Sequence, residues 1–182
     1  MPKLKVFLWQ LCHASLPTRG VLFTRGLHID PLCPHCHSEI EDAEHLFLGC
    51  HAVQHVWRLA NDHTWLKINI PLDYHHSVQD WLATLRLSTH LFKMDRLVSL
   101  LWSIWKSRNN AVFRKESSNP VITLIRAKRA CAEWRVRHAL SHSLQPSHLR
   151  FPLPNHKKSY WVAWHKPQGG FIKINFDGPK SP

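Results

Sequence analysis

The 182-residue sequence lacks any long apolar run. The strongest, Leu97 to Trp105, is about half the length that a membrane crossing needs, and it contains Ser99 and Ser103. The first nine residues place lysines before apolar residues, as a secretory signal does, but the chain then turns polar and offers no convincing small-residue cleavage site. We therefore expect a mature N-terminal helix, no membrane-spanning segment, and an intracellular protein, nuclear or cytoplasmic.

The number of cysteines in the sequence is odd, so they cannot all pair in disulfides within one chain. There are five, and three of them are spaced like metal ligands, which argues against a disulfide framework and for a reducing compartment. The other two, Cys12 and Cys131, lie in apolar helical stretches, so we predict that both are ordinary core thiols. The sequence shows no internal repeat.

Acidic residues are scarce and unevenly placed. Twelve Asp and Glu stand against 24 Lys and Arg, a net charge of +12. Residues 1–60 are neutral overall, 61–116 carry +3 and 159–182 carry +2, whereas 117–158 hold eight basic residues and one acidic residue, net +7. If RNA or DNA is a partner, we expect its phosphates to contact mainly 117–158.

Three cysteines and one histidine form the most distinctive pattern in the chain. A Cys-x-x-Cys turn at Cys33 and Cys36 is followed by His45 and Cys50. Such a turn lets two sulfurs point at one ion, and the second pair would come from the start of a helix. Tetrahedral zinc takes this set of ligands in closed structural sites, which leave no position for a substrate water. We predict one structural zinc ion.

Other interpretations of this cluster stay open at the level of sequence. His35, His37 and His51 each adjoin a proposed ligand in a chain with 16 histidines, and His45 is favoured by its offset from Cys50. The four residues could also be near one another by chance. A catalytic Cys/His pair is a further alternative, although no third group is evident to orient it.

Hydrophobic periodicity predicts a mainly α fold: a small zinc-stabilised helical domain followed by helices, with a short C-terminal β-hairpin-like fragment. The 44% hydrophobic content, with nine Trp and eight Phe, is enough for a core. Thr18 and Asn119 are predicted N-caps, and Gly26 suits a C-terminal turn. Helices are expected over 3–14, 18–25, 52–60, 78–87, 89–113 and from Pro120 onwards. The predicted divisions are 1–60 zinc-binding, 61–142 helical, 143–158 linker and 159–182 strand-like.

The helix after Pro120 has two different faces. Leu124, Ala127, Cys131 and Trp134 share one side, while Arg126, Arg129 and Arg137 fall on another. A cationic helix face is often simply solvated. Because Glu133 is the only acid nearby, these three arginines are also our candidate nucleic-acid contacts.

Residues 2–57 contain a series of short motifs: Pro2 to Trp9, Leu16-Pro17-Thr18, Arg25-Gly26, Cys33-Pro34-x-Cys36, Glu44-His45-Leu46-Phe47, Cys50 and Val56-Trp57. With these motifs the segment resembles the zinc-binding domain that follows the polymerase in plant LINE-type (non-LTR) retrotransposon reverse transcriptases. Further along, Ile104-Trp105-Lys106-Ser107-Arg108-Asn109-Asn110 is similar to a stretch that comes after that domain, and residues 164–178 resemble the opening strand of a ribonuclease H-like domain.

The resemblance implies the same four zinc ligands, and it makes Asp177 the counterpart of the first metal-binding acid of ribonuclease H. A single carboxylate cannot hold paired magnesium ions, and no further acid follows Asp177. We therefore expect a fragment or degenerate copy of a mobile-element polyprotein, without polymerase or ribonuclease activity. Its expected role is non-enzymatic, with RNA or DNA bound through 117–158 and with no membrane or small-molecule partner.

Two alternatives belong to other functional classes. The first is a zinc-stabilised protein–protein adaptor, which exposed tryptophans among Trp57, Trp81, Trp102 and Trp105 would favour. The second, less favoured, is a ribonuclease H-type enzyme. The sequence does not determine the oligomeric state.

Overall fold

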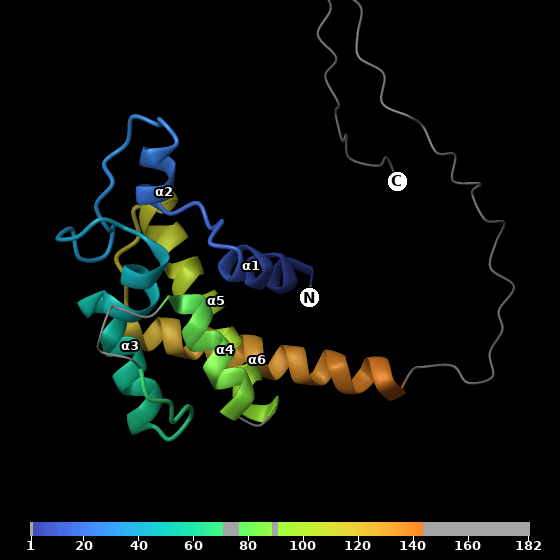
Figure 1. Ribbon diagram of the computed structural model, residues 1–182. Helices are drawn as coiled ribbons and strands as arrows, with labels where there is room; N and C mark the ends of the chain where they lie inside the picture. Colours follow the sequence, from blue (N-terminus) through green and yellow to red (C-terminus); the bar gives the residue numbers. More distant parts are fainter. Residues whose placement is uncertain (1, 71–76, 89–90, 144–182) are drawn as a thin grey trace, which may run out of the picture. The chain divides into compact units, whose positions relative to one another are not determined.

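The computed structural model describes residues 2–70, 77–88 and 91–143. In these residues the chain is helical, which confirms the predicted mainly α fold, and one isolated antiparallel bridge joins Leu32 to Ile40. The predicted strand-like runs of 159–182, and the predicted linker 143–158 beyond Ser143, lie outside the described residues. The elements are α1 (Pro2–Cys12), α2 (Arg19–Thr24), the π-helical turn η1 (His45–Gly49), α3 (His51–Asp62), α4 (Val78–Ser88), α5 (Leu91–Arg114) and α6 (Pro120–Ser143) (Figure 1).

Local start and stop signals account for several helix ends. Thr18 Oγ1 accepts a hydrogen bond from Val21 N at 3.4 Å at the start of α2. Gly26, with φ of +86°, follows the end of that helix, a conformation that costs glycine little. Asn119 Oδ1 accepts from Ile122 N at 3.1 Å and so caps α6. The structure confirms these three predictions. The sequence could predict these helix ends because each signal involves only a few neighbouring residues.

Phe7 of α1 lies at the centre of the packing between the first helix, η1 and α5. Its ring centroid is 6.2 Å from that of Phe47, 5.3 Å from Trp102 and 6.5 Å from Trp105. Leu4 and Leu11 lie one turn to either side of Phe7, and both are buried. The inner face of α1 is therefore closed by side chains from nearly 100 residues further along the chain.

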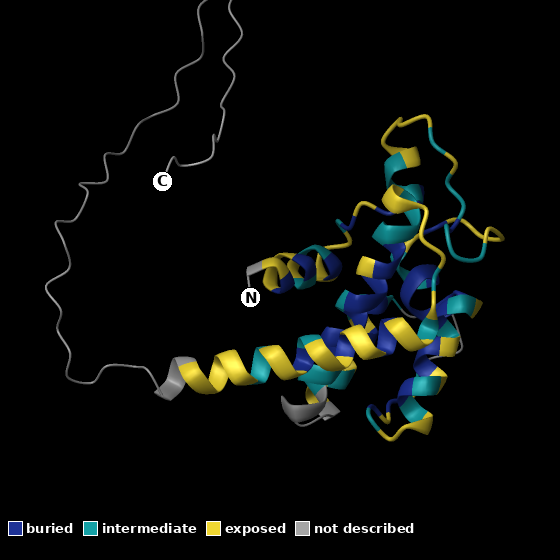
Figure 2. Ribbon diagram, turned by 180° about the vertical axis from the view of Figure 1, so that it is seen from behind, coloured by how far each residue is buried: buried dark blue, intermediate teal, exposed yellow. Residues whose placement is uncertain are grey.

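The segments predicted as 1–60 and 61–142 lie in one compact unit, Met1–Leu144, with a common hydrophobic core. Trp57 of α3 and Trp81 of α4 meet edge to face at 5.9 Å, and both rings are buried. α6 packs on α5 and α3 through its buried side, whereas much of the rest of this helix is exposed (Figure 2). In the described residues, no helix combines the length and the apolar content needed to cross a membrane.

The two cysteines outside the zinc pattern differ in burial. Cys131 is buried on the inner side of α6, as predicted. Cys12 is exposed, so the prediction that it is a core thiol is wrong. The cause is helical geometry: Cys12 lies about 100° around α1 from its neighbour Leu11, which belongs to the buried row.

Candidate metal centre

A short hairpin-like turn presents the first two cysteines. The bridge between Leu32 and Ile40 brings its two arms together. Cys33 N donates to Glu39 O at 2.8 Å, and His37 N donates to Cys33 O at 2.9 Å. His37 takes a positive φ of 55° where the turn reverses. Cys33 and Cys36 are thereby held on the same side of the turn, as the Cys-x-x-Cys spacing predicts.

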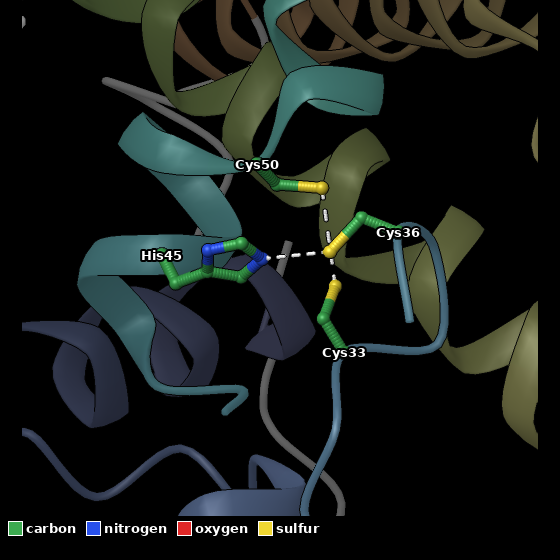
Figure 3. A group of neighbouring side chains, drawn as sticks. All are labelled: Cys33, Cys36, His45 and Cys50. Atoms are coloured by element: carbon green, nitrogen blue, oxygen red, sulfur yellow. Dashed lines mark hydrogen bonds between the residues drawn. The ribbon is translucent and has the colours of Figure 1, made fainter. Parts of the chain in front are cut away.

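The second pair of residues comes from two consecutive helical segments. His45 begins the π-helical turn η1, where its backbone N–H donates to Asp42 Oδ1 at 2.6 Å. Cys50 ends η1, donates its own N–H to His45 O at 2.6 Å, and is the N-cap of α3. The wider π turn spans the four residues between His45 and Cys50, so both side chains face the hairpin-like turn (Figure 3).

The four side chains converge with the dimensions of a tetrahedral zinc site. Their ligand atoms all lie within 4.8 Å of one another. Cys33 Sγ is 3.9 Å from Cys50 Sγ, and Cys36 Sγ is 3.2 Å from His45 Nε2 (Figure 3). Zinc–sulfur bonds of about 2.3 Å in a tetrahedron place two sulfurs about 3.8 Å apart. The donor set and its spacing fit one structural zinc ion.

The close approach of the four groups shifts their pKa values. Burial lowers the pKa of His45, but hydrogen bonds and charge from the Cys33 and Cys36 sulfurs outweigh burial and raise this pKa to about 9. The hydrogen bond between Cys33 and Cys50, together with burial, raises the pKa of Cys33 to about 12, and the same bond lowers that of Cys50. A divalent cation supplies the charge that an imidazolium would otherwise provide.

Glu39 supports the histidine from behind. Its Oε2 lies 2.9 Å from His45 Nδ1, while His45 Nε2 faces the sulfurs. A carboxylate in this position fixes the imidazole tautomer and orients the ring toward the metal. The sequence has four acidic residues between Cys36 and His45, and the geometry gives the first of them a specific role.

Glu41, two residues further on, points the other way and is fully buried. Its carboxylate accepts hydrogen bonds from Arg108 Nε at 2.7 Å, from the terminal nitrogen Nη2 of Arg108, and from the backbone N–H of Arg19 at 2.7 Å. The Arg108 guanidinium lies 5.0 Å from the Trp105 ring centroid. This buried ion pair ties the hairpin-like turn to α2 and to α5, and sequence reasoning missed it.

The neighbouring histidines are not part of the cluster. His37 and His51 are exposed. Both ring nitrogens of His35 are buried and have no hydrogen-bond partner among the described residues. Burial lowers the pKa of His35 to about 4, so this imidazole is neutral at pH 7. The four-residue group found in the structure is the one predicted, with His45 as its histidine.

The remaining predicted site residues lie elsewhere. Arg126, Arg129 and Arg137 are exposed on α6 and border a hollow of about 570 Å³ between α1, α5 and α6. They form no part of the metal cluster. Asp177 lies outside the described residues.

Comparison with known families agrees with this site. Residues 1–57 match the family model described as zinc-binding in reverse transcriptase. This match contains all four cluster residues and covers less than a third of the chain. Neither the curated proteins nor the solved structures yielded a match.

Proposed function

We propose that this chain is a zinc-stabilised accessory module of a LINE-type reverse transcriptase, that it is not catalytic by itself, and that it holds RNA or DNA. The observation that carries the proposal is the buried Cys₃His cluster within a segment that matches the reverse-transcriptase zinc-binding family. Four protein ligands complete a tetrahedral shell, so the metal has no open position for substrate. The zinc would stabilise the fold, and nucleic acid would bind to another surface of the chain.

The basic side of α6 supports that division of roles. Arg126, Arg129 and Arg137 are exposed, and the segment that contains them carries +7. The zinc-binding segment 1–60 is neutral overall. Because phosphate contacts depend on unneutralised cations, nucleic acid would bind along α6.

The test is the salt dependence of binding by the full chain. Three phosphate contacts predict that affinity for a labelled oligonucleotide falls roughly tenfold or more between about 50 and about 200 mM salt. Changing Arg126, Arg129 and Arg137 to Ala should weaken binding and flatten this dependence. Arg25→Ala with Arg58→Ala, at two exposed arginines elsewhere, is the control. Undetectable or salt-independent binding would refute the proposal.

A protein–protein adaptor stays as the second candidate. The tryptophans expected to favour it do not: Trp57, Trp81 and Trp105 are buried, and Trp102 is half-buried. A different feature does favour it, because α6 exposes an apolar row on its outer side. That row consists of Val121, Ile122, Ile125, Val136 and Leu140. A partner that is retained after nuclease treatment, and lost in Ile125→Lys with Val136→Lys, would support the adaptor.

A further inference from the structure

A hollow in the described part of the chain is lined by three helices that are far apart in sequence. It has a volume of about 570 Å³. One wall is α1, one is α5 and the third is α6. We name it the three-helix cleft, and its lining residues are Lys3, Leu4, Trp102, Ser103, Lys106, Arg126, Arg129, Ala130, Glu133 and Arg137.

The charge of this cleft is strongly positive. Lys3 and Lys106 add two cations from α1 and α5 to the three arginines of α6, and all five residues are exposed. Glu133 is the one acid in the lining. The ion pairs formed among the described residues involve none of these five cations. Like charges that converge on a concave surface focus a field that attracts a polyanion.

The shape of the cleft distinguishes among polyanions. Trp102 lies in its lining, half-buried, with one edge held by Phe7 at 5.3 Å between ring centroids. An aromatic ring fixed inside a basic groove suits a strand whose bases are free to stack, because the bases of a duplex are already stacked on one another. Arg126 and Arg137 are eleven residues apart on one helix, which is about 16 Å. At the roughly 3.4 Å per nucleotide of a stacked, B-form strand, that length spans about five nucleotides.

A second hollow continues the path along α6. It has a volume of about 300 Å³, and Arg126 lines both hollows. Its lining includes the polar side chains of Ser107, Asn110, Ser117 and Asn119. The same lining also contains Glu116 and Ile122. A strand that leaves the three-helix cleft beside Arg126 would therefore meet several hydrogen-bonding side chains together with one carboxylate and one apolar side chain.

We propose that the three-helix cleft binds a single-stranded nucleic acid, with its backbone between the five cations and one base stacked on Trp102. This inference rests on the proposed function and extends it from one helix face to a site built by α1, α5 and α6. Lys3, Lys106 and Trp102 have a role in it that their positions in the sequence do not suggest.

The experiment compares neighbouring lysines in the zinc-loaded full chain. The probes are a fluorescein-labelled oligothymidylate of about 12 nucleotides, within the range of single-strand site sizes, and a duplex of the same length. Lys3→Ala and Lys106→Ala should each weaken single-strand binding about fivefold or more and reduce the salt slope by about 0.7. Lys5→Ala and Lys128→Ala are the controls, because these exposed lysines lie on α1 and α6, two of the helices that form the cleft, but outside its lining. Each should change affinity by less than about twofold.

Three further variants examine the Trp102 ring and the Glu133 carboxylate. Trp102→Leu should weaken binding by about tenfold, and Trp102→Phe, which keeps a stacking surface, should recover part of that loss. Glu133→Gln should strengthen binding because it removes the negative charge of the lining. Zinc content and circular dichroism accompany each variant, and Lys106→Gln replaces Lys106→Ala if that change alters either.

The possible results separate this inference from the function on which it rests. If the chain binds the oligonucleotide but the cleft and control lysines behave alike, the cleft assignment is wrong and nucleic-acid association stands. Tighter binding of the duplex than of the single strand would overturn the single-strand assignment. Absence of binding to both probes would refute both proposals.

Discussion

The imidazole of His45 is held from two sides. Nε2 faces the sulfurs, with Cys36 Sγ at 3.2 Å, and Nδ1 faces the carboxylate of Glu39 at 2.9 Å. Because each ring nitrogen has its own partner, the ring has a single orientation suited to the metal. Glu39 is more than half exposed, so its role here is to orient His45 and not to fill the core.

Glu39→Gln should therefore weaken zinc binding without unfolding the chain. The amide can still hydrogen-bond to Nδ1, but it lacks the negative charge that increases the basicity of the imidazole. Loss of such a partner typically lowers metal affinity about 10- to 100-fold, and competition with a chromophoric chelator measures it. Asp62→Asn, an equal change of charge at the exposed end of α3, should leave the affinity unchanged. Equal affinities for both variants would contradict this role.

The four metal ligands could be predicted from the sequence, whereas the roles of two nearby glutamates could not. Cys33, Cys36, His45 and Cys50 were predictable because metal coordination imposes a spacing that can be read along the chain. Glu39 and Glu41 both lie in the acidic stretch between Cys36 and His45, yet one supports a ligand and the other is fully buried. That difference depends on Arg108, 67 residues away, and no local pattern specifies such a partner.

At the scale of elements, the zinc-binding turn is anchored to α5 as well as to the metal. Arg108 of α5 reaches Glu41 through two nitrogens, and Arg19 N at the start of α2 donates to the same carboxylate. Gly20 N donates to the Glu41 carbonyl oxygen at 2.9 Å. A Cβ at Gly20 would lie 2.7 Å from that oxygen, so glycine allows this close approach.

Breaking this ion pair from one side should be costly. Arg108→Met leaves the Glu41 carboxylate buried without its cation, and we expect a loss of about 3–5 kcal/mol in the free energy of unfolding. Glu41→Gln combined with Arg108→Met should restore part of it, because neither partner is then charged. Urea unfolding measures the free energy of unfolding of the unchanged chain, of Arg108→Met and of the double variant.

The matched control for the Arg108→Met variant is Arg114→Met, also on α5. Its partner Glu116 is 3.9 Å away and both side chains are largely exposed, so the expected loss is below about 1 kcal/mol. If Arg108→Met costs no more than the control, the anchoring role of the pair is wrong.

Helix positions were largely predictable, and the faces of α6 were only partly so. Caps such as Thr18 and Asn119 act on residues three positions away, so their signals are local. α6 has apolar residues both on its buried side, such as Leu124, and on its exposed side, such as Val136. With weak periodicity, the sequence indicated one apolar face and one basic face. The cleft on its flank depends on α1 and α5, which local reasoning cannot place beside it.

At the scale of the whole molecule, the core does not follow the division predicted at residue 60. Phe7 and Phe47 belong to the zinc-binding segment, and the rings that cover Phe7 from the other side, Trp102 and Trp105, come from α5. Periodicity shows which residues of a helix are buried but not which helix covers them. The four zinc ligands and the apolar core are therefore two separate requirements for folding of the same segment.

A chain cut to residues 1–60 should meet only the first requirement. Its four ligands are all present, so it should still bind about one zinc ion per chain, since their spacing is local. Its core would be open, because Phe7 would lose Trp102 and Trp105 of α5, and Trp57 would lose Trp81 of α4. We expect zinc-loaded 1–60 to bind a hydrophobic dye and to unfold without a cooperative transition. Residues 1–144 should bind little dye and unfold in one step. Cooperative unfolding of 1–60 at the same denaturant midpoint as 1–144 would show that zinc alone stabilises the segment and that α5 is dispensable for its fold.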